Sequence, residues 1–341
     1  MNHWKLRLRK DYARVLYRAH LAPAFWRPFG SNLTILNYHQ FVSRTSSNFL
    51  QVSHSSLLRQ LDTLQKISDI VPLSHIFNVP LSFDNNKSHR RPTISVTIDD
   101  GDRSVLDVLS IFGEFSIPIT IFLPMGLIIN KDFDDGCRSI LLRYRCLTPK
   151  SLLISELKVN KEAAFEMILS ASMKNIRELL YRIENDSSHR YVWPRKLLTV
   201  DDIKILSENP LVTIASHSMS HLPLSVLPKF LLEWEIEKSI DWIRQFGGDT
   251  TLFAYPYGVP GTYNQLTNSK LRMSGVRFAF NSTSFPTSLD TSSFVFGRSF
   301  VSDSCDGDYI GGLGYGAFEI WDRIRYSNYF IRSRPPWYLS L

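Results

Sequence analysis

Three short segments, far apart in the chain, each follow an apolar run with the composition of a buried strand. They are TIDDG at 97–101, SHSMSH at 216–221 and FAYPYG at 253–258. Side chains that follow parallel strands meet at one end of a sheet or barrel, so the three segments together predict a single site. Paired carboxylates, paired imidazoles and a tight aromatic turn are the parts that a metal-assisted hydrolase needs.

The first segment places two acids at the end of the strand predicted over 93–98. In a metal-assisted hydrolysis, one carboxylate binds the ion and its neighbour takes a proton from the attacking water. Asp99 and Asp100 can divide these tasks because they point in different directions. The alternative is that both acids begin the helix predicted over 103–112, since acids favour the first turn of a helix.

The second segment places His217 and His221 four residues apart. Imidazoles at this spacing can face one ion if the residues between them form a helical turn. One carboxylate and two imidazoles leave positions open on a zinc-like ion for water and substrate, as a catalytic site requires. The alternative is a pair of ordinary polar histidines in a loop.

The third segment ends its strand in a Pro-Tyr-Gly turn. Such a turn fixes the backbone and can aim a main-chain N–H at a developing oxyanion. The rings of Tyr255 and Tyr257 would suit the face of a sugar, which makes both residues candidates for substrate binding. A purely structural turn is the alternative.

With the segments ILNYH at 35–39 and IPITIF at 117–122, the chain resembles the polysaccharide deacetylase family, the carbohydrate esterase group (family 4) that includes chitooligosaccharide deacetylases. The resemblance extends to about residue 301. It implies that Asp99 is the general base, that Asp100, His217 and His221 hold a divalent metal, and that the backbone N–H of Tyr257 binds the oxyanion. The implied reaction removes N-acetyl groups from an amino sugar and releases acetate. The implied metal is Zn²⁺, with Co²⁺ or another divalent ion as alternatives.

The chain departs from the family pattern at two points. Ala254 stands where many members carry an arginine before the Pro-Tyr element, and no histidine follows His221, so the usual late general acid is missing. His39, at the end of the strand predicted over 33–38, is the best remaining candidate for the acid, with a structural hydrogen-bonding role as the alternative. Arg298 is a candidate for orienting Asp99, with a surface ion pair as the alternative.

Strand-like runs alternate with helical patterns, which predicts an α/β fold: a distorted, TIM-like (β/α) barrel of seven or eight strands. Two helices have apolar faces within 57–67 and 232–246. We expect a barrel over 31–310, with a helical insertion at about 127–198 and a C-terminal extension over 311–341. The predicted strands are 33–38, 69–72, 93–98, 117–123, 211–215, 252–255, 276–280 and 294–298.

Residues 1–30 form a basic arm, with seven basic side chains against one acidic, and carry most of the net charge of +7. Apolar residues interleave with the charges, as in a helix that lies on an anionic membrane surface. The alternatives are an arm packed on the barrel and one that meets an acidic glycan. Nucleic acid is not an expected partner, because the arm has no recognised reading motif.

The arm has no uninterrupted apolar region of a secretory signal. Three cysteines without metal-ligand spacing predict free thiols in a reducing compartment. Together these features predict a cytoplasmic protein, peripheral on the inner face of the membrane. The expected substrate is an N-acetylated oligo- or polysaccharide, lipid-linked or still under assembly, in glycan biosynthesis.

Two other functions fit the sequence. One is a catalytically silent carbohydrate-binding barrel that lost turnover together with its general acid. The other is hydrolysis of a non-sugar amide by the same site. Retention of both aspartates and both histidines favours an enzyme, because a binding groove needs no base beside a metal triad.

Overall fold

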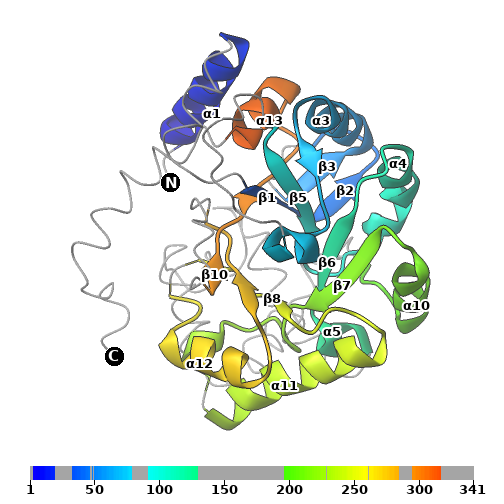
Figure 1. Ribbon diagram of the computed structural model, residues 1–341, viewed down its shortest axis with the longest axis vertical. Helices are drawn as coiled ribbons and strands as arrows, with labels where there is room; N and C mark the ends of the chain where they lie inside the picture. Colours follow the sequence, from blue (N-terminus) through cyan, green and yellow to red (C-terminus); the bar gives the residue numbers. More distant parts are fainter. Residues whose placement is uncertain are drawn as a thin grey trace, which may run out of the picture.

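Parallel strands form the centre of the molecule, and helices surround them (Figure 1). The computed structural model describes residues 3–19, 33–46, 48, 50–78, 91–129, 196–227, 229–259, 261–283 and 294–315. The strands are β1 (Leu33–Tyr38), β2 (Gln40–Val42), β3 (Gln51–Ser53), β4 (Asp69–Ile70), β5 (Thr93–Ile98), β6 (Ile119–Leu123), β7 (Val212–Ser216), β8 (Leu252–Ala254), β9 (Phe278–Phe280), β10 (Val295–Phe296) and β11 (Ser299–Phe300).

Helices connect most successive strands. The α-helices are α1 (His3–Arg18), α3 (His54–Ile67), α4 (Leu109–Glu114), α5 (Met125–Ile129), α10 (Val200–Glu208), α11 (Lys229–Gln245), α12 (Gln265–Met273) and α13 (Gly307–Gly314). Within the described residues, the 3₁₀ helices are η1 (Leu73–Asn78), η2 (Arg103–Val108) and η3 (Leu224–Val226).

The main sheet has the order β10-β9-β8-β7-β6-β5-β1-β11, with β4 beside β5, and every pair is parallel. All carboxyl ends therefore lie at one end of the sheet. Its two edge strands, β10 and β11, are joined by only two residues, Gly297 and Arg298. A link this short requires the sheet to curl until its edges approach each other, as the arc of strands in Figure 1 shows.

Alternate side chains of these strands fill the inside of the curled sheet, as in a (β/α) barrel. Leu252 and Ala254 of β8 face this interior cluster, whereas Phe253 packs outward against α11 and α12. The interior cluster comprises Leu33, Ile35, Leu73, Phe122, Ala215, Leu252, Ala254, Phe280 and Phe296. The predicted (β/α) barrel fold is confirmed.

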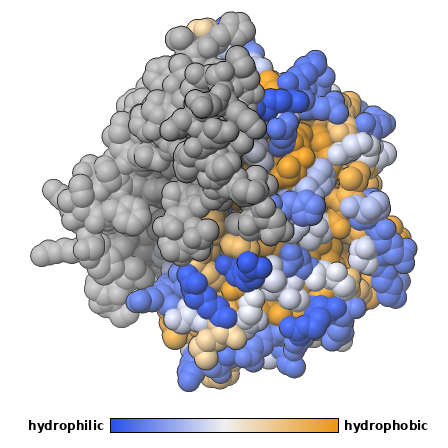
Figure 2. Space-filling view, in the orientation of Figure 1, coloured by the Kyte–Doolittle hydropathy of each residue, from blue (hydrophilic) through white to orange (hydrophobic). Residues whose placement is uncertain are grey.

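Outside the sheet, helices bury their apolar faces against the strands. Leu57, Leu61 and Leu64 of α3 are fully buried, and Leu232, Ile236 and Ile240 of α11 lie in the cluster that packs on β8 and β9. On the face seen in Figure 2, hydrophilic residues lie mostly along the outer edge over the helices, and hydrophobic residues appear between them.

Each of the eight predicted strand runs contains a strand, shortened at the ends in most cases. The strands β2, β3 and β11, of two or three residues each, were not predicted. The alternative in which Asp99 and Asp100 begin the next helix is excluded. The residue that caps η2 is Asp102, whose carboxylate accepts a hydrogen bond from the N–H of Ser104.

The N-terminal arm contains helix α1, which packs on α13 along residues 11–18. Ala13 and Leu16 are buried in this contact, and Arg14 Nε lies 2.7 Å from Asp306 Oδ2. This packing agrees with the alternative in which the arm lies on the barrel. Membrane contact stays a prediction.

Much of the predicted insertion, including residues 130–195, lies outside the described residues, as do 316–341 of the predicted extension. Helix α13 crosses the boundary predicted at residue 310. Of the three cysteines, Cys305 is described; it is buried, and its Sγ accepts a hydrogen bond from the N–H of Ser302. In the described part of the chain, no helix has the length and hydropathy to cross a membrane.

The contact between α1 and α13 needs a glycine. A Cβ on Gly312 would lie 2.7 Å from the carbonyl oxygen of Ala13, whereas a Cβ on Gly113 in α4 would meet nothing within 4 Å. We expect Gly312→Ala to lower the free energy of unfolding by about 1–3 kcal/mol and to expose α1 to protease. Gly113→Ala should raise it by about 0.5–1 kcal/mol through helix propensity. Urea denaturation and limited proteolysis check both, and equal stabilisation by the two variants would contradict the close packing.

Candidate functional site

The candidate site lies at the carboxyl ends of the strands. Asp99 and Asp100 follow β5, His217 follows β7, and Tyr257 lies beyond the end of β8. His39 separates β1 from β2, and Arg298 lies between β10 and β11. The parallel sheet thus carries these residues from five strand ends toward one end of the barrel.

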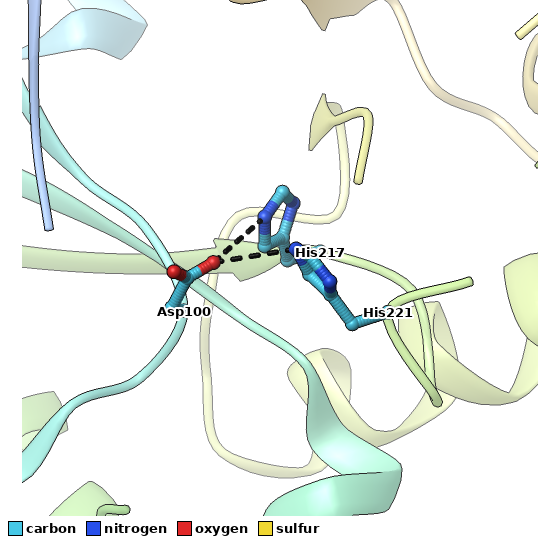
Figure 3. A group of neighbouring side chains, drawn as sticks. All are labelled: Asp100, His217 and His221. Atoms are coloured by element: carbon cyan, nitrogen blue, oxygen red, sulfur yellow. Dashed lines mark ion pairs between the residues drawn. The ribbon is translucent and has the colours of Figure 1, made fainter. Parts of the chain in front are cut away.

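Asp100, His217 and His221 form a cluster of potential metal ligands (Figure 3). Each offers one ligand atom, and these atoms all lie within 4.8 Å of one another. The Oδ1 atom of Asp100 is 3.5 Å from Nε2 of His217 and 3.3 Å from Nε2 of His221. All three side chains are buried, so a cation here would be shielded from bulk water.

The donors fit a divalent ion. His217 Nδ1 lies 2.8 Å from the carbonyl oxygen of Ala254, which can only accept, so Nδ1 must carry the proton. The lone pair of Nε2 then points toward Asp100, and among the described residues this buried atom has no hydrogen-bond partner. A second bond that fixes the tautomer of a ligating histidine is typical of zinc sites.

Asp99 lies in a different environment from its neighbour. Its two carboxylate oxygens accept hydrogen bonds from both terminal nitrogens of Arg298, each at 2.7 Å. The amide of Asn37 donates a further bond of 2.9 Å to Oδ2. Asp99 and Arg298 are both almost completely buried, and Oδ2 lies 4.0 Å from Nε2 of His217. A carboxylate is thereby fixed beside the metal-ligand cluster.

The pKa of Asp99 lies well below its ordinary value. Burial alone would raise this pKa, but the positive charge and hydrogen bonds of Arg298, with contributions from His217 and His39, outweigh burial. Asp99 is therefore ionised at neutral pH. The stability linked to this ionisation is present above the unfolded pKa of ~3.9 and is lost as the pH falls through the lower folded value.

The backbone of the site is strained at four non-glycine residues. Asp100, Ser218, His221 and Tyr257 have φ of 77°, 66°, 56° and 63°. Side chains with a Cβ rarely adopt this left-handed region, and residues that do so gather at functional sites. The two imidazoles come together without a helical turn between them: residues 217–223 form neither helix nor strand. The two rings meet edge-on, with centroids 4.7 Å apart.

Tyr257 lies beside the cluster, with its ring centroid 4.9 Å from that of His221. The turn needs Gly258, because a Cβ there would lie 2.5 Å from the backbone nitrogen of Ser282.

The ring of Tyr255 was expected to face the substrate, but the structure places it elsewhere. Its side chain is fully buried, stacks on Tyr263 and donates a 2.7 Å hydrogen bond to Asn268 of α12. Adjacent strand residues face opposite sides, which turns Tyr255 outward with Phe253.

His39 is buried, and its ring lies 5.1 Å from that of Phe300. It is near enough to Asp99 to help lower the pKa of that carboxyl. Arg298 is fully buried, which excludes the alternative of a surface ion pair.

Sequence reasoning missed two buried polar residues, Asn37 and Glu235. Asn37 lies inside the segment 35–39, but nothing in its spacing indicated a bond to Asp99. Glu235 of α11 accepts hydrogen bonds from the N–H groups of Met219 and Ser220, at 2.8 and 2.9 Å. Burial raises the pKa of Glu235, although these bonds and the serine hydroxyls oppose the rise. The sequence did carry a signal for Glu235, because it is an acid on the apolar face of the helix predicted within 232–246.

Comparisons with known proteins agree with this geometry. The family model described as polysaccharide deacetylase matches residues 86–279. No curated protein matches the chain. Several solved structures share the fold. IcaB from Ammonifex degensii has 17% identity and a TM-score of 0.56, over 84% of this chain and 98% of that one.

The deacetylase PplD from Streptococcus pyogenes, solved with acetate, has 13% identity and a TM-score of 0.54, over 82% of this chain and 96% of that one. A de-N-acetylase from Aggregatibacter actinomycetemcomitans has 14% identity and a TM-score of 0.51, over 82% and 99%. The family match spans more than half of the sequence and includes the aspartate and histidine segments. The chain belongs to the polysaccharide deacetylase family.

Proposed function

We propose that this protein is a metal-dependent N-deacetylase that removes acetyl groups from the amino sugars of an oligo- or polysaccharide and releases acetate. One observation carries the proposal: a three-ligand cluster lies beside an ionised, buried aspartate at the strand ends of a polysaccharide deacetylase. A mere binding groove would gain nothing from such a carboxylate, since its burial carries a free-energy cost. The names of the similar structures, two of them deacetylases or de-N-acetylases, support the choice of reaction.

Asp100, His217 and His221 would hold the ion, and Zn²⁺ suits their mixed nitrogen and oxygen donors. When bound, the ion supplies Lewis acidity, which polarises the acetyl carbonyl and makes a nearby water more acidic. The protein fixes the ligands by burial and by the bond from His217 to Ala254.

Asp99 would act as the general base that takes a proton from the attacking water. Its lowered pKa keeps it ionised over the working range, and Arg298 and Asn37 hold its carboxylate in one orientation. Many family members carry an arginine at the position of Ala254, which orients the base. We assign this positioning role to Arg298 here, because Ala254 cannot supply it. A base held in this way needs no reorientation before it reacts.

Two residues would handle the charges that develop during hydrolysis. The backbone N–H of Tyr257, in a strained turn beside His221, would donate to the oxyanion. His39 would return a proton to the departing amine, so that the sugar leaves as a stable product. His39 lies near enough to Asp99 for the two side chains to interact electrostatically.

The basic residues near the N-terminus support a proposal for where the protein meets its substrate. The basic arm over 1–30 supports a lipid-linked or unfinished glycan met at an anionic membrane surface, in the cytoplasm on the inner face of the membrane. Packing of α1 on α13 would then hold the arm on the barrel while its remaining basic residues meet the surface.

Acetate release from N-acetylglucosamine and N-acetylgalactosamine oligosaccharides tests the proposal. We expect metal-stripped protein to be inactive, Zn²⁺ or Co²⁺ to restore activity, and Asp99→Asn to lower kcat by a factor of about 10²–10⁴ while the metal stays bound. Metal content and acetate are measured on the same samples. Protein that binds metal and glycan but releases no acetate would show a silent binder, and release only from small amides would show a different substrate.

The role of His39 is tested by His39→Gln. If this imidazole is the general acid, kcat falls by a factor of about 10²–10⁴ and the decline of rate at high pH is lost. Substrates whose leaving groups need no protonation should be far less affected. Unchanged kcat and an unchanged pH profile would assign His39 a structural role beside Phe300.

The role of Arg298 is tested by Arg298→Gln. Without the guanidinium, burial raises the pKa of Asp99, so the acid limb of the kcat/KM profile moves to higher pH. Loss of one partner of a buried pair should also cost about 3–5 kcal/mol in unfolding free energy. Arg277→Gln, at an exposed arginine near the start of β9, is the control. An acid limb that stays in place would contradict the positioning role.

A further inference from the structure

The segment between the two histidines has no regular secondary structure, so its backbone groups need partners from elsewhere. The N–H of His217 donates to the carbonyl of Leu123, at 3.0 Å. The carbonyls of Ser218 and Met219 accept from the N–H groups of Met125 and Leu127 in α5, at 3.1 and 3.2 Å. The segment is thus clamped on one side by the end of β6 and the start of α5.

On the other side, the carboxylate of Glu235 fills the same need. Its Oε2 atom accepts from the N–H of Met219 at 2.8 Å and from the N–H of Ser220 at 2.9 Å. The side chain is 2% exposed and comes from α11, whose other inward residues are apolar or small. A buried N–H that lacks an acceptor is costly, so these two bonds help to hold a loop that contains strained residues.

The strain lies at the positions that flank these two bonds. Ser218 and His221 are both in the left-handed region, and the Ser218 hydroxyl accepts from the N–H of His221 at 3.1 Å. This local bond closes the turn that aims the second imidazole. Without Glu235, two buried N–H groups between the strained residues would lose their acceptor, and the turn could relax to an unstrained form.

We infer that Glu235 is a positioning residue that holds the 217–221 segment in the one conformation that brings both imidazoles to the metal. The inference rests on the proposed metal site and extends it to a residue that touches neither ion nor substrate. Its consequence is specific: loss of the carboxylate weakens metal binding itself, beyond any general loss of stability.

The test compares Glu235→Ala and Glu235→Gln with wild type and with Glu237→Ala. Glu237 lies on the same helix, but it is exposed and pairs with Lys270. Affinity for Zn²⁺ alone is measured by competition with a chromophoric chelator, and ligand geometry is read from the absorption of the Co²⁺ protein. Urea unfolding of each metal-free variant reports stability separately.

We expect Glu235→Ala to bind Zn²⁺ at least about tenfold more weakly and to alter the Co²⁺ spectrum. Glu235→Gln should lie between it and wild type, because one amide oxygen can still accept both bonds. Glu237→Ala should match wild type. Folded Glu235→Ala with wild-type affinity and spectrum would overturn the inference. If that variant does not fold, wild-type affinity in Glu235→Gln would overturn it.

The outcome is separable from that of the proposed function, because no glycan enters the measurement. Weakened metal binding in Glu235→Ala together with no acetate release from the wild type would keep the inference and reject the deacetylase. Acetate release with unchanged affinity in Glu235→Ala would do the reverse.

Discussion

The structure depends on the buried ion pair between Asp99 and Arg298. Removing two charges from water costs several kcal/mol for each, so such a pair persists only if its hydrogen bonds are nearly complete. Here Arg298 donates twice to Asp99, once to the carbonyl of Asn281 and once, at 3.3 Å, to the hydroxyl of Thr97. These bonds join the end of β5 to the end of β9 across the seam between β10 and β11. The ion pair that ties Arg298, between the two edge strands, to the end of β5 is therefore the one that keeps the proposed base ionised.

The strand order determines what can be placed beside that base. Strand β6 separates β5 from β7, and its carboxyl end carries the first bond of the histidine segment, from His217 to Leu123. Both imidazoles lie beside Asp100 (Figure 3). The left-handed backbone conformations of Asp100 and His221 bring their side chains close to each other. Hydrogen bonds around the segment offset the strain of these conformations. The rigid sheet and the strained loops together fix the positions of the three potential metal ligands.

Much of this arrangement could be predicted from sequence, because the signals were local. Each strand was an apolar run of β-branched or aromatic residues, and each polar segment followed such a run. The loop conformations could not be predicted. A helical turn is the simplest way to bring the rings of His217 and His221 together. The structure instead uses left-handed backbone at Ser218 and His221, with the carboxylate of Glu235 holding the residues between them. Strand periodicity places Phe253 and Tyr255 on one face, but which face is buried against α12 depends on the whole core. Asn37 bonds to Asp99, 62 residues along the chain, and Glu235 bonds to Met219, 16 residues away. No local sequence pattern reveals bonds of this kind.

The central claim is that strand ends bring one carboxylate and two imidazoles onto a single ion. X-ray absorption at the zinc edge of metal-loaded protein measures this most directly, with His221→Ala as the matched variant. The account predicts a first shell of nitrogen and oxygen with the outer-shell scattering of two imidazoles, reduced to one in the variant. A spectrum without imidazole scattering, or one that His221→Ala leaves unchanged, would contradict it.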